Sequence, residues 1–527
     1  MKGMRQHWRN KLTIGCWLAL TGIMATSAQA MTFDEHVITT EMTLTQGVIS
    51  ANVLPHPGNE LITVGVDDKQ QRWLLIYGFV DNKLSRLDKA LIDRSFIQYD
   101  VFEPDDPLPN NPLQNLFFTS KDMLYQYVTP YRDAAVTTPP VKNEHQHWLE
   151  VAPISSLVMT EKPDYIAKGD FVRDINGDGL GDVIISDFNQ THLLLAQADG
   201  SWHQQSIGLL PIVEVTQSGA EYSRSEIFYS DMNFDQRLDL IKVGEGMLEV
   251  YYQKEDGTFA DVAGFVSVSQ PISGVNWWNK RDAYGKPLDQ SDLLYRKVEH
   301  IKDINGDGFT DLVVRYTKSS GVFDRSNDYE VYLGTQPNSE SLSNTVQFSR
   351  NPSSLIRAEG TLTGLKFADL DNDNIEEVIV SGFDIGVTQV IGALLSGSID
   401  QDVYIFKMDT NSQFPSEANE SKQVQLNFSL TSGQSGQPVV MVADINGDGL
   451  DELLLSDSDA AIKIYTGQKG AVPFSRKSQS LNVDVPTEGS MLSVADINGD
   501  GKDDLYLQYG PQDDDKLQQQ LRVLIAK

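Results

Sequence analysis

Six short acidic segments of this chain combine the residue types and the spacing of a metal-binding loop. Each segment places an Asp, Asn or Glu at its first, third, fifth and ninth positions. If the chain curls around one point, these side-chain oxygens and the backbone carbonyl of the seventh position can surround a hard cation. The predicted ligands, five per segment, are Asp174, Asn176, Asp178, Leu180 and Asp182; Asp231, Asn233, Asp235, Arg237 and Asp239; Asp303, Asn305, Asp307, Phe309 and Asp311; Asp369, Asp371, Asp373, Ile375 and Glu377; Asp444, Asn446, Asp448, Leu450 and Glu452; and Asp496, Asn498, Asp500, Lys502 and Asp504.

The ligand set favours calcium over other metals. All the predicted ligands are oxygens in a flexible loop, whereas magnesium demands a stricter octahedron and keeps its waters. A single copy would be explained equally well as a polar turn, because Asn-Gly and Asp-Gly are common hairpin residues. Six copies with the same acid spacing favour a metal site instead. We therefore expect up to six bound calcium ions.

The six copies are not equivalent. The curl requires a left-handed backbone at the sixth position, which glycine or asparagine adopts readily. Five copies supply such a residue, namely Gly179, Gly308, Asn374, Gly449 and Gly501. The second copy has Phe234 and Gln236 where the others have Gly or Asn, so we expect the 231–239 site to be weak or empty. The fourth copy has four carboxylates among its ligands, which predicts a strong site.

The residues around each segment indicate strands. An apolar side chain lies two residues before every copy, and runs such as Val183-Ile-Ile and Leu312-Val-Val follow directly. Short apolar runs of this kind are typical of strands buried on both faces. The copies start 52 to 75 residues apart, which is enough for one four-stranded sheet each. Helical calcium hands are disfavoured, since they need flanking helices and a Glu at position twelve.

Residues 165–527 resemble the FG-GAP repeats of integrin α-subunit propellers and their bacterial relatives, the VCBS-type repeats. The resemblance is carried by the repeated Asp-x-Asn/Asp-x-Asp-Gly-x-x-Asp/Glu pattern, as in Asp444 to Glu452. It implies that each acidic loop lies between the first two strands of a propeller blade. It also implies a calcium-binding protein that works as a binding or adhesion-type module.

The N-terminal third keeps the strand pattern without the acidic loop. Residues 60–66 with 73–77, and residues 115–120 with 123–128, each read as one degenerate unit. Two such units and six repeats predict an all-β propeller of about eight four-stranded blades, with seven as the alternative. We expect one domain over 31–527, with two degenerate blades in 31–165 and six loop-bearing blades in 166–527. Residues 37–44 are expected to pair with the C-terminal strand 521–525 and close the ring.

The composition restricts the partners and the compartment. The 527 residues contain 42 Lys and Arg against 74 Asp and Glu, a net charge of −32, which excludes nucleic acid and anionic lipid surfaces as natural partners. Of the 74 acids, 19 occupy predicted ligand positions, so much of this charge is tied to the expected metal. Residues 1–30 have the basic start, apolar stretch and small-residue end of a signal peptide. We expect a periplasmic or secreted protein, monomeric and without membrane insertion after cleavage.

No catalytic constellation stands out from the loop carboxylates, so we expect a non-enzymatic binder of a protein or glycan ligand. The candidate contacts lie in the insertion 271–292, at Trp277, Trp278, Arg281 and Tyr284, which suit stacking on sugars or gripping a peptide. These tryptophans could equally pack over a blade edge. Two alternatives remain: an enzyme acting on extracellular polysaccharide in a central funnel, and a structural subunit of an envelope assembly that uses the glycine-rich insertion 384–400.

Overall fold

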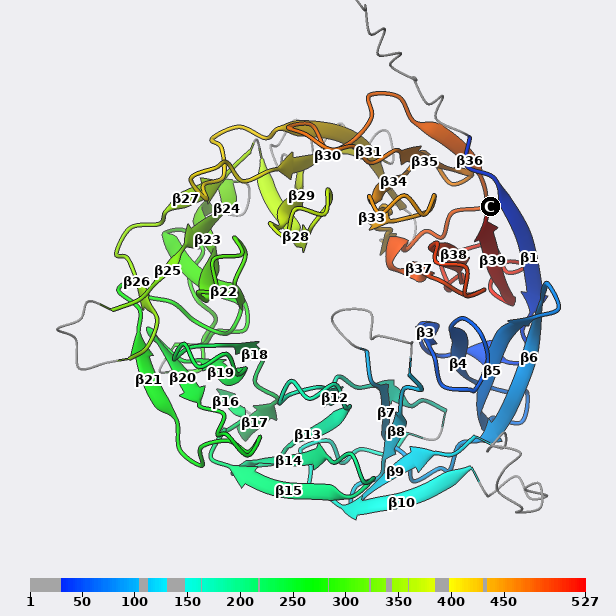
Figure 1. Cartoon of the computed structure of the whole chain (residues 1–527), viewed down its shortest axis with the longest axis horizontal. Coiled ribbons are helices and arrows are strands. Elements are labelled where there is room, and N and C mark those ends of the chain that lie inside the picture. Colours follow the sequence, from blue (N-terminus) through cyan, green and yellow to red (C-terminus); the bar gives the residue numbers. More distant parts are fainter. Residues whose placement is uncertain are drawn as a thin grey trace, which may run out of the picture.

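Eight β-sheets follow one another around a central opening (Figure 1). The computed structural model describes residues 30–103, 112–129, 147–162, 164–216, 219–282, 284–321, 324–337, 344–358, 360–383, 398–429 and 434–527. Within these ranges the regular structure is strand, apart from one 3₁₀ turn, η1, at Gly489–Met491. The predicted all-β propeller is confirmed, and its blades number eight rather than seven.

Blades 1 to 4 occupy the first half of the chain, and the strands of each run from the centre outward in chain order, except that the short β11 of blade 2 pairs in parallel with β7 at the inner edge. Their strands are, for blade 1, β2 (Thr43–Leu44), β3 (Ile49–Ala51), β4 (Glu60–Val66), β5 (Arg72–Val80) and β6 (Lys83–Leu91); for blade 2, β7 (Gln98–Val101), β8 (Leu116–Thr119), β9 (Met123–Tyr127), β10 (Trp148–Pro153) and β11 (Ala167–Lys168); for blade 3, β12 (Val172–Arg173), β13 (Asp182–Ser186), β14 (Thr191–Ala196) and β15 (Trp202–Ile207); and for blade 4, β18 (Ile227–Ser230), β19 (Asp239–Val243), β20 (Met247–Tyr251) and β21 (Gly264–Ser267).

Blades 5 to 8 complete the ring, and two small hairpins stand beside the blades. The strands are, for blade 5, β22 (Leu293–Lys302), β23 (Asp311–Gly321), β24 (Asp324–Tyr332) and β27 (Ser354–Ile356); for blade 6, β28 (Thr361–Ala368), β29 (Glu377–Phe383), β30 (Ser398–Phe406), β31 (Glu420–Ser429) and β32 (Gln434–Ser435); for blade 7, β33 (Val440–Ala443), β34 (Glu452–Ser456), β35 (Ala461–Tyr465) and β36 (Gln479–Asn482); for blade 8, β37 (Leu492–Ala495), β38 (Asp504–Leu507), β39 (Gln520–Ala526) and β1 (Phe33–Thr39); and for the hairpins, β16 (Ile212–Thr216) with β17 (Gly219–Ser223) and β25 (Gly334–Thr335) with β26 (Gln347–Phe348).

The second strand of each repeat is its most buried element, as the apolar runs predict. Every residue of β13 is buried, and so is every residue of β38. Outer strands are more exposed, and β36 alternates between half-buried and exposed residues. The apolar clusters lie between neighbouring blades, one of them joining Ile184 and Leu193 of blade 3 to Leu240 and Tyr251 of blade 4. Each blade is therefore held by its neighbours around the ring.

The ring closes through the N-terminal strand. β1 pairs antiparallel with β39, from Phe33 opposite Ala526 to Thr39 opposite Gln520, so the first and last parts of the chain share blade 8 (Figure 1). The expected closing strand, 37–44, is placed too late in the sequence. The chain turns after Thr39, where the Thr40 hydroxyl donates to the Met42 carbonyl, and Thr43–Leu44 then joins blade 1.

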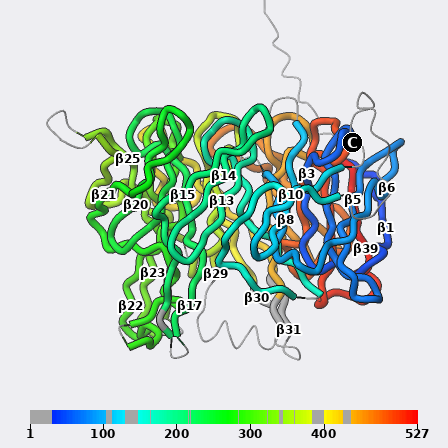
Figure 2. Tube along the Cα trace, turned by 90° about the horizontal axis from the view of Figure 1, so that it is seen from below, coloured from blue at the N-terminus to red at the C-terminus, as the bar shows by residue number. Residues whose placement is uncertain are grey.

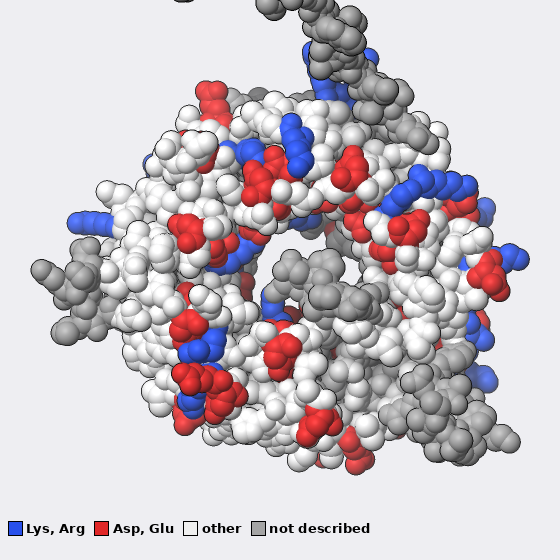
Figure 3. Space-filling view, in the orientation of Figure 1, with Lys and Arg blue, Asp and Glu red and all other residues white. Residues whose placement is uncertain are grey.

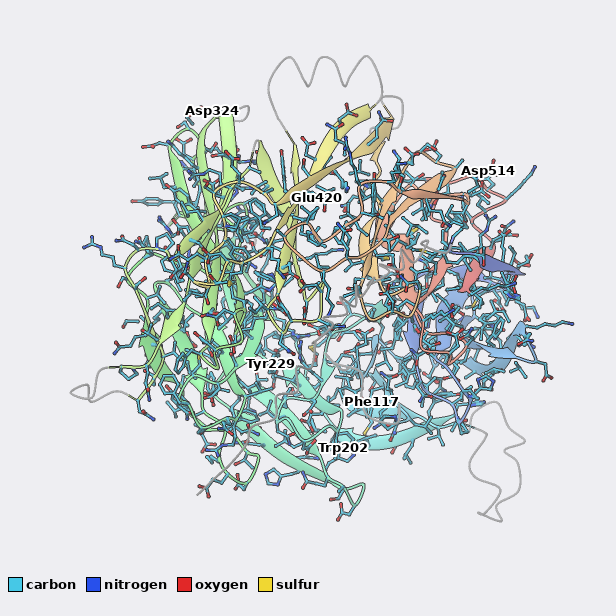
Figure 4. All side chains as sticks on the ribbon, turned by 45° about the horizontal axis from the view of Figure 1, so that its top comes forward. Phe117, Trp202, Tyr229, Asp324, Glu420 and Asp514 are labelled. Carbon is cyan, nitrogen blue, oxygen red and sulfur yellow. The ribbon has the colours of Figure 1, made fainter. Side chains whose placement is uncertain are left out.

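Two further views locate the parts used below. Seen from its edge, the ring is thick, and strands β17, β22 and β23 project from one side of it (Figure 2). Figure 4 labels Phe117 of β8 and Trp202 of β15, whose rings meet edge to face with centroids 5.7 Å apart and join blades 2 and 3. Tyr229, on the innermost strand of blade 4, is labelled on the inner side of the ring.

Candidate functional site

The six acidic loops lie between the first and second strands of blades 3 to 8. Each loop follows an innermost strand, such as β12, and its ninth residue opens the next strand, such as β13. The apolar second position of every loop is fully buried and anchors the loop in the core between the blades. These anchors are Ile175, Met232, Ile304, Leu370, Ile445 and Ile497.

The first aspartate curls the loop by accepting backbone hydrogen bonds. In blade 3, Asp174 Oδ1 accepts the N–H groups of Gly177 (2.7 Å) and Asp178 (3.1 Å), and Oδ2 accepts that of Gly179 (2.7 Å). In blade 8, Asp496 accepts the corresponding three N–H groups at 2.7, 3.1 and 2.8 Å. The curl inferred from the spacing is therefore built by the same residue in loops of different blades.

The backbone is left-handed at the fourth position as well as the sixth. Gly177 and Gly179 have φ values of 78° and 83°, and Asn372 and Asn374 have values of 56° and 64°. The sequence pattern predicts a left-handed backbone only at the sixth position. The 231–239 loop keeps the same curl with non-glycine residues, Phe234 at 66° and Gln236 at 65°, as expected for the sixth position. Such residues resist this conformation, at a cost of roughly 1 kcal/mol each.

The ninth-position carboxylate is buried and tied to both flanking strands. Asp182 is fully buried; its Oδ2 accepts the Ile175 N–H (3.1 Å) and its Oδ1 accepts the Ala196 N–H at the end of the third strand (2.7 Å). Asp504 repeats the arrangement with Ile497 (3.0 Å) and Ala526 (2.8 Å). The ninth position thus joins three strands of its blade through one side chain.

The acids of a loop influence one another's charge. Burial, reinforced by the carboxylates at the fifth and first positions, raises the pKa of the ninth-position acids to about 7. This holds for Asp182, Asp239, Asp311, Glu452 and Asp504. Several acids that disfavour one another's charge, arranged with amide and carbonyl oxygens, fit a hard divalent cation. In such a site the first, third, fifth and ninth side chains and the seventh carbonyl would hold calcium.

In two loops of the described chain a basic side chain pairs with loop carboxylates. In the 231–239 loop, Arg237 Nη2 lies 2.5 Å from Asp235 Oδ2, and Arg237 Nε donates to the Gln253 carbonyl (3.3 Å). In the 369–377 loop, the Lys407 ammonium lies among three carboxylates. Arg237 belongs to the motif, whereas Lys407 lies 30 residues beyond its last position, so no local pattern pointed to it.

Neighbouring loops contact one another around the ring. At two junctions the eighth position of one loop donates to the backbone carbonyl of the first position of the loop before it. The Asp503 N–H donates to the Asp444 carbonyl (2.9 Å), and the Thr310 hydroxyl donates to the Asp231 carbonyl (2.6 Å). We call the six loops, residues 174–182, 231–239, 303–311, 369–377, 444–452 and 496–504, the loop belt.

Blade 1 contains a degenerate seventh loop, Asn52–Glu60, which the sequence analysis missed. Glu60 opens β4, is fully buried, and accepts the N–H groups of Val53 (2.8 Å) and Leu54 (3.1 Å) through Oε2. The Asn59 N–H donates to the Asp496 carbonyl (3.0 Å), so this loop occupies the place after the last loop of the belt. Leu54 and His56 stand where acids or amides would be ligands, so only Asn52 at the first position and Glu60 at the ninth keep ligand-type side chains.

The aromatic insertion divides into buried and exposed residues. Trp277 is 7% exposed and lies under the Arg325 guanidinium, with 5.7 Å between that group and the ring centroid. Trp278 is 48% exposed and Tyr284 is 86% exposed. Arg281 Nη1 donates to the Trp278 carbonyl (2.9 Å), which holds this part of the insertion together. Trp277 therefore packs on the blade, and three of the four candidate residues remain available at the surface.

A groove of about 790 Å³ runs beside the insertion. We call it the hairpin groove, because strand β16 of the β16–β17 hairpin lines it, together with residues of blade 4 and residues 274–275, 279–282 and 284–285 of the insertion. Arg281 and Tyr284 line it, together with Val213, Glu214 and Asn279. A wall that mixes an exposed aromatic ring with amide, acidic and basic groups is suited to a polar ligand with an apolar face.

A second cavity, of about 950 Å³, opens on the central side of blades 3 to 6, where the space-filling view shows the ring hollowed (Figure 3). The lining includes titratable groups: Arg173, Arg224, Glu226, Glu299, His300, Lys302 and Glu376. Most are paired. Lys297 Nζ bridges Glu226 (2.9 Å) and Glu299 (3.2 Å), and Lys302 pairs with Glu376 (2.5 Å). Burial, reinforced by Lys302 and Lys297, lowers the pKa of His300 to about 4.

Some predicted features lie outside the described residues. These are residues 1–29 of the proposed signal peptide and residues 384–397 of the glycine-rich insertion. Among the residues that the structure does describe, no helix is long and apolar enough to cross a membrane.

Comparisons with known proteins identify the repeat. The family model described as an FG-GAP-like repeat matches residues 444–507, from the loop of blade 7 to the second strand of blade 8. No curated protein matches the chain in sequence.

Solved structures share the architecture only distantly. A lectin of Agrocybe aegerita specific for terminal N-acetylglucosamine is 14% identical over 83% of this chain and 94% of its own, with a TM-score of 0.36. BBS1N, solved in complex with ARL6DN, is 9% identical over 93% and 94%, with a TM-score of 0.33. The Vibrio cholerae biofilm matrix protein Bap1 is 12% identical over 82% and 88%, with a TM-score of 0.28. These likenesses carry no argument about function. The chain is an eight-bladed β-propeller, and the match at residues 444–507 supports an FG-GAP-type repeat in it.

Proposed function

We propose that this protein is an exported, calcium-binding propeller that acts as a non-catalytic binding module for a glycan or protein ligand. The observation that carries the binding role is the hairpin groove, with the exposed Tyr284 ring and Arg281 on one wall. Its 790 Å³ are enough for a small oligosaccharide or a short peptide.

Calcium has a structural role in this proposal. Bound ions neutralise carboxylates that repel one another, and they bind only the folded loops. Where a hydrogen bond joins two loops, as between 444–452 and 496–504, an ion in one loop also stiffens the next. The 231–239 site stays weak, since Arg237 occupies one of its carboxylates and Phe234 and Gln236 strain its backbone.

The binding role is tested on an array of glycans, followed by titration of any hit. We expect Arg281→Ala and Tyr284→Ala, which change two residues that line the groove, each to weaken binding at least about tenfold, as central arginine and aromatic contacts do. The matched control is Phe265→Ala, which removes an exposed ring (66%) from β21 outside the groove. Binding that both groove variants leave unchanged would exclude the groove as the ligand site.

A second candidate function, an enzyme acting on extracellular polysaccharide, is favoured by the titratable groups of the central cavity. Such an enzyme needs two carboxyl groups set apart by the width of a sugar bond. Glu226 and Glu299 line the cavity, but Lys297 engages both, which favours the binder. Release of reducing sugar from a polysaccharide panel, abolished by Glu299→Gln, would establish the enzyme instead.

A further inference from the structure

The fourth loop of the belt holds an ammonium group among three of its carboxylates, whereas in the 231–239 loop the Arg237 guanidinium pairs with one carboxylate. Lys407 Nζ lies 2.9 Å from Asp371 Oδ2, 3.0 Å from Asp373 Oδ2 and 2.8 Å from Glu377 Oε1. An ammonium has three N–H donors, and each here meets a carboxylate. The side chains are 17% exposed for Lys407, 9% for Asp371 and 1% for Glu377, whereas Asp373 at the rim is 41% exposed.

The position of Lys407 is equivalent to an uncharged residue in the other five repeats. It follows Phe406, which pairs with Val378, the residue after the ninth position. The same register places an uncharged residue at this point in every other loop-bearing blade. These residues are Leu195, Tyr252, Leu333, Thr466 and Ile525.

The 369–377 loop also differs from the other five loops in the residue at its third position, which is Asp371 and not Asn. In four of the other loops a third-position Asn donates its Nδ2 to the fifth-position Asp, at 3.0 to 3.1 Å. Asp371 cannot donate such a bond, and Lys407 supplies the donor to Asp373 instead. The extra acid and the basic side chain therefore form one unit, and the three aspartates of this loop have ligand oxygens within 4.8 Å of one another.

We infer that Lys407 takes the place of calcium in blade 6, so that the 369–377 loop is held by an internal cation and stays formed without metal. A calcium ion would need the same carboxylate oxygens and would be repelled by the ammonium among them. The inference rests on the proposed calcium binding of the other loops. It differs from the expectation based on ligand charge, by which the four carboxylates of the 369–377 loop would make it a strong calcium site.

The test compares bound calcium per chain in the wild type and in Lys407→Leu, which installs the residue of blades 3 and 5. Both proteins are equilibrated with calcium, desalted and measured by elemental analysis. We expect the variant to hold one ion more than the wild type, whatever the wild-type number is. Equal numbers would overturn the inference. If the wild type bound no calcium and the variant bound one ion, the proposed calcium binding of the other loops would be wrong. The inference about Lys407 would still hold.

A second measurement needs no variant. In the wild type, acetylation of lysines by an amine-reactive reagent is followed by mass spectrometry with calcium and with a chelator. We expect Lys407 to be protected in both conditions, like the buried, paired Lys422, while the more exposed Lys463 reacts. Reactivity of Lys407 that rises on adding calcium would show that calcium displaces the ammonium, and would overturn the inference.

Discussion

Blades 3 and 6 place a buried carboxylate at the same point of the fold and surround it differently. Asp182 faces further acids and no basic group, whereas Glu377 faces Lys407. Blade 1 adds a third arrangement, in which Glu60 is buried and its Oε1 lacks a hydrogen-bond partner. We propose that calcium neutralises Asp182, that Lys407 neutralises Glu377 and that Glu60 carries a proton. On this proposal, one loop architecture accommodates its ninth-position acid in three different ways.

We expect the removal of calcium to have the largest effect on the stability of the fold. Each ion contributes about 2.7 kcal/mol when free calcium exceeds Kd a hundredfold, and four strong sites act together. We expect a chelator to lower Tm by about 10 °C or more, measured by differential scanning fluorimetry. Calcium re-addition should restore the melt and magnesium should not. An unchanged melt in chelator would contradict the calcium role.

The buried acid of blade 1 gives a pH dependence that calcium does not control. Burial raises the pKa of Glu60 from 4.5 to about 7. An acid with a raised folded pKa stabilises the fold fully below about pH 4.5, and this contribution is lost as the pH rises through about 7. The shift corresponds to on the order of 3 kcal/mol.

We therefore expect Glu60→Gln to lose less stability than the wild type between pH 5 and pH 8. The measurement is denaturant unfolding of both proteins in excess calcium at a series of pH values. Parallel curves over this range would show that Glu60 is not held as a neutral acid.

Matched substitutions at the fifth position separate the loops of blades 3 and 6. Asp178→Asn should remove one calcium ion and cost about 2 to 3 kcal/mol in calcium, with little effect in chelator. Asp373→Asn removes a half-exposed contact to Lys407, so we expect a loss under about 1 kcal/mol, equal in both conditions, and no change in calcium count. The same calcium-dependent loss in both variants would abolish the distinction between the two loops.

Backbone strain gives the smallest difference. Gln236→Gly should stabilise the 231–239 loop by about 1 kcal/mol, because glycine adopts the left-handed conformation at little cost. Gly179→Gln is the reverse change at the same position of blade 3, where no atom lies within 4 Å of an added Cβ. We expect it to destabilise by a similar amount in denaturant unfolding. A loss of stability in Gln236→Gly together with a gain in Gly179→Gln would refute the strain argument.

The repeating features of the molecule could be predicted because each is local in sequence. Apolar runs identified strands such as β13, and the acid spacing identified the loops between strands. The two degenerate blades followed from the same strand pattern. The turn at Thr40, which ends the closing strand early, depends on one side-chain hydrogen bond and had no such pattern.

The missed features depend on contacts that are distant in sequence or on degenerate positions. Lys407 reaches Asp371 only because β30 returns beside β29 after an insertion, so spacing could not reveal the pair. Glu60 lost the acidic neighbours that mark the other loops. Trp277 and Trp278 are adjacent in sequence, yet their burial differs because successive side chains point in different directions.

Anomalous X-ray diffraction from crystals grown in calcium tests whether four loops bind calcium while a fifth is held by Lys407. We expect calcium peaks inside the loops 174–182, 303–311, 444–452 and 496–504, each bounded by the first, third, fifth and ninth side chains. We expect Lys407 Nζ, and no peak, inside 369–377. Loops without calcium at those four positions, or a calcium peak among Asp371, Asp373 and Glu377, would contradict this proposal.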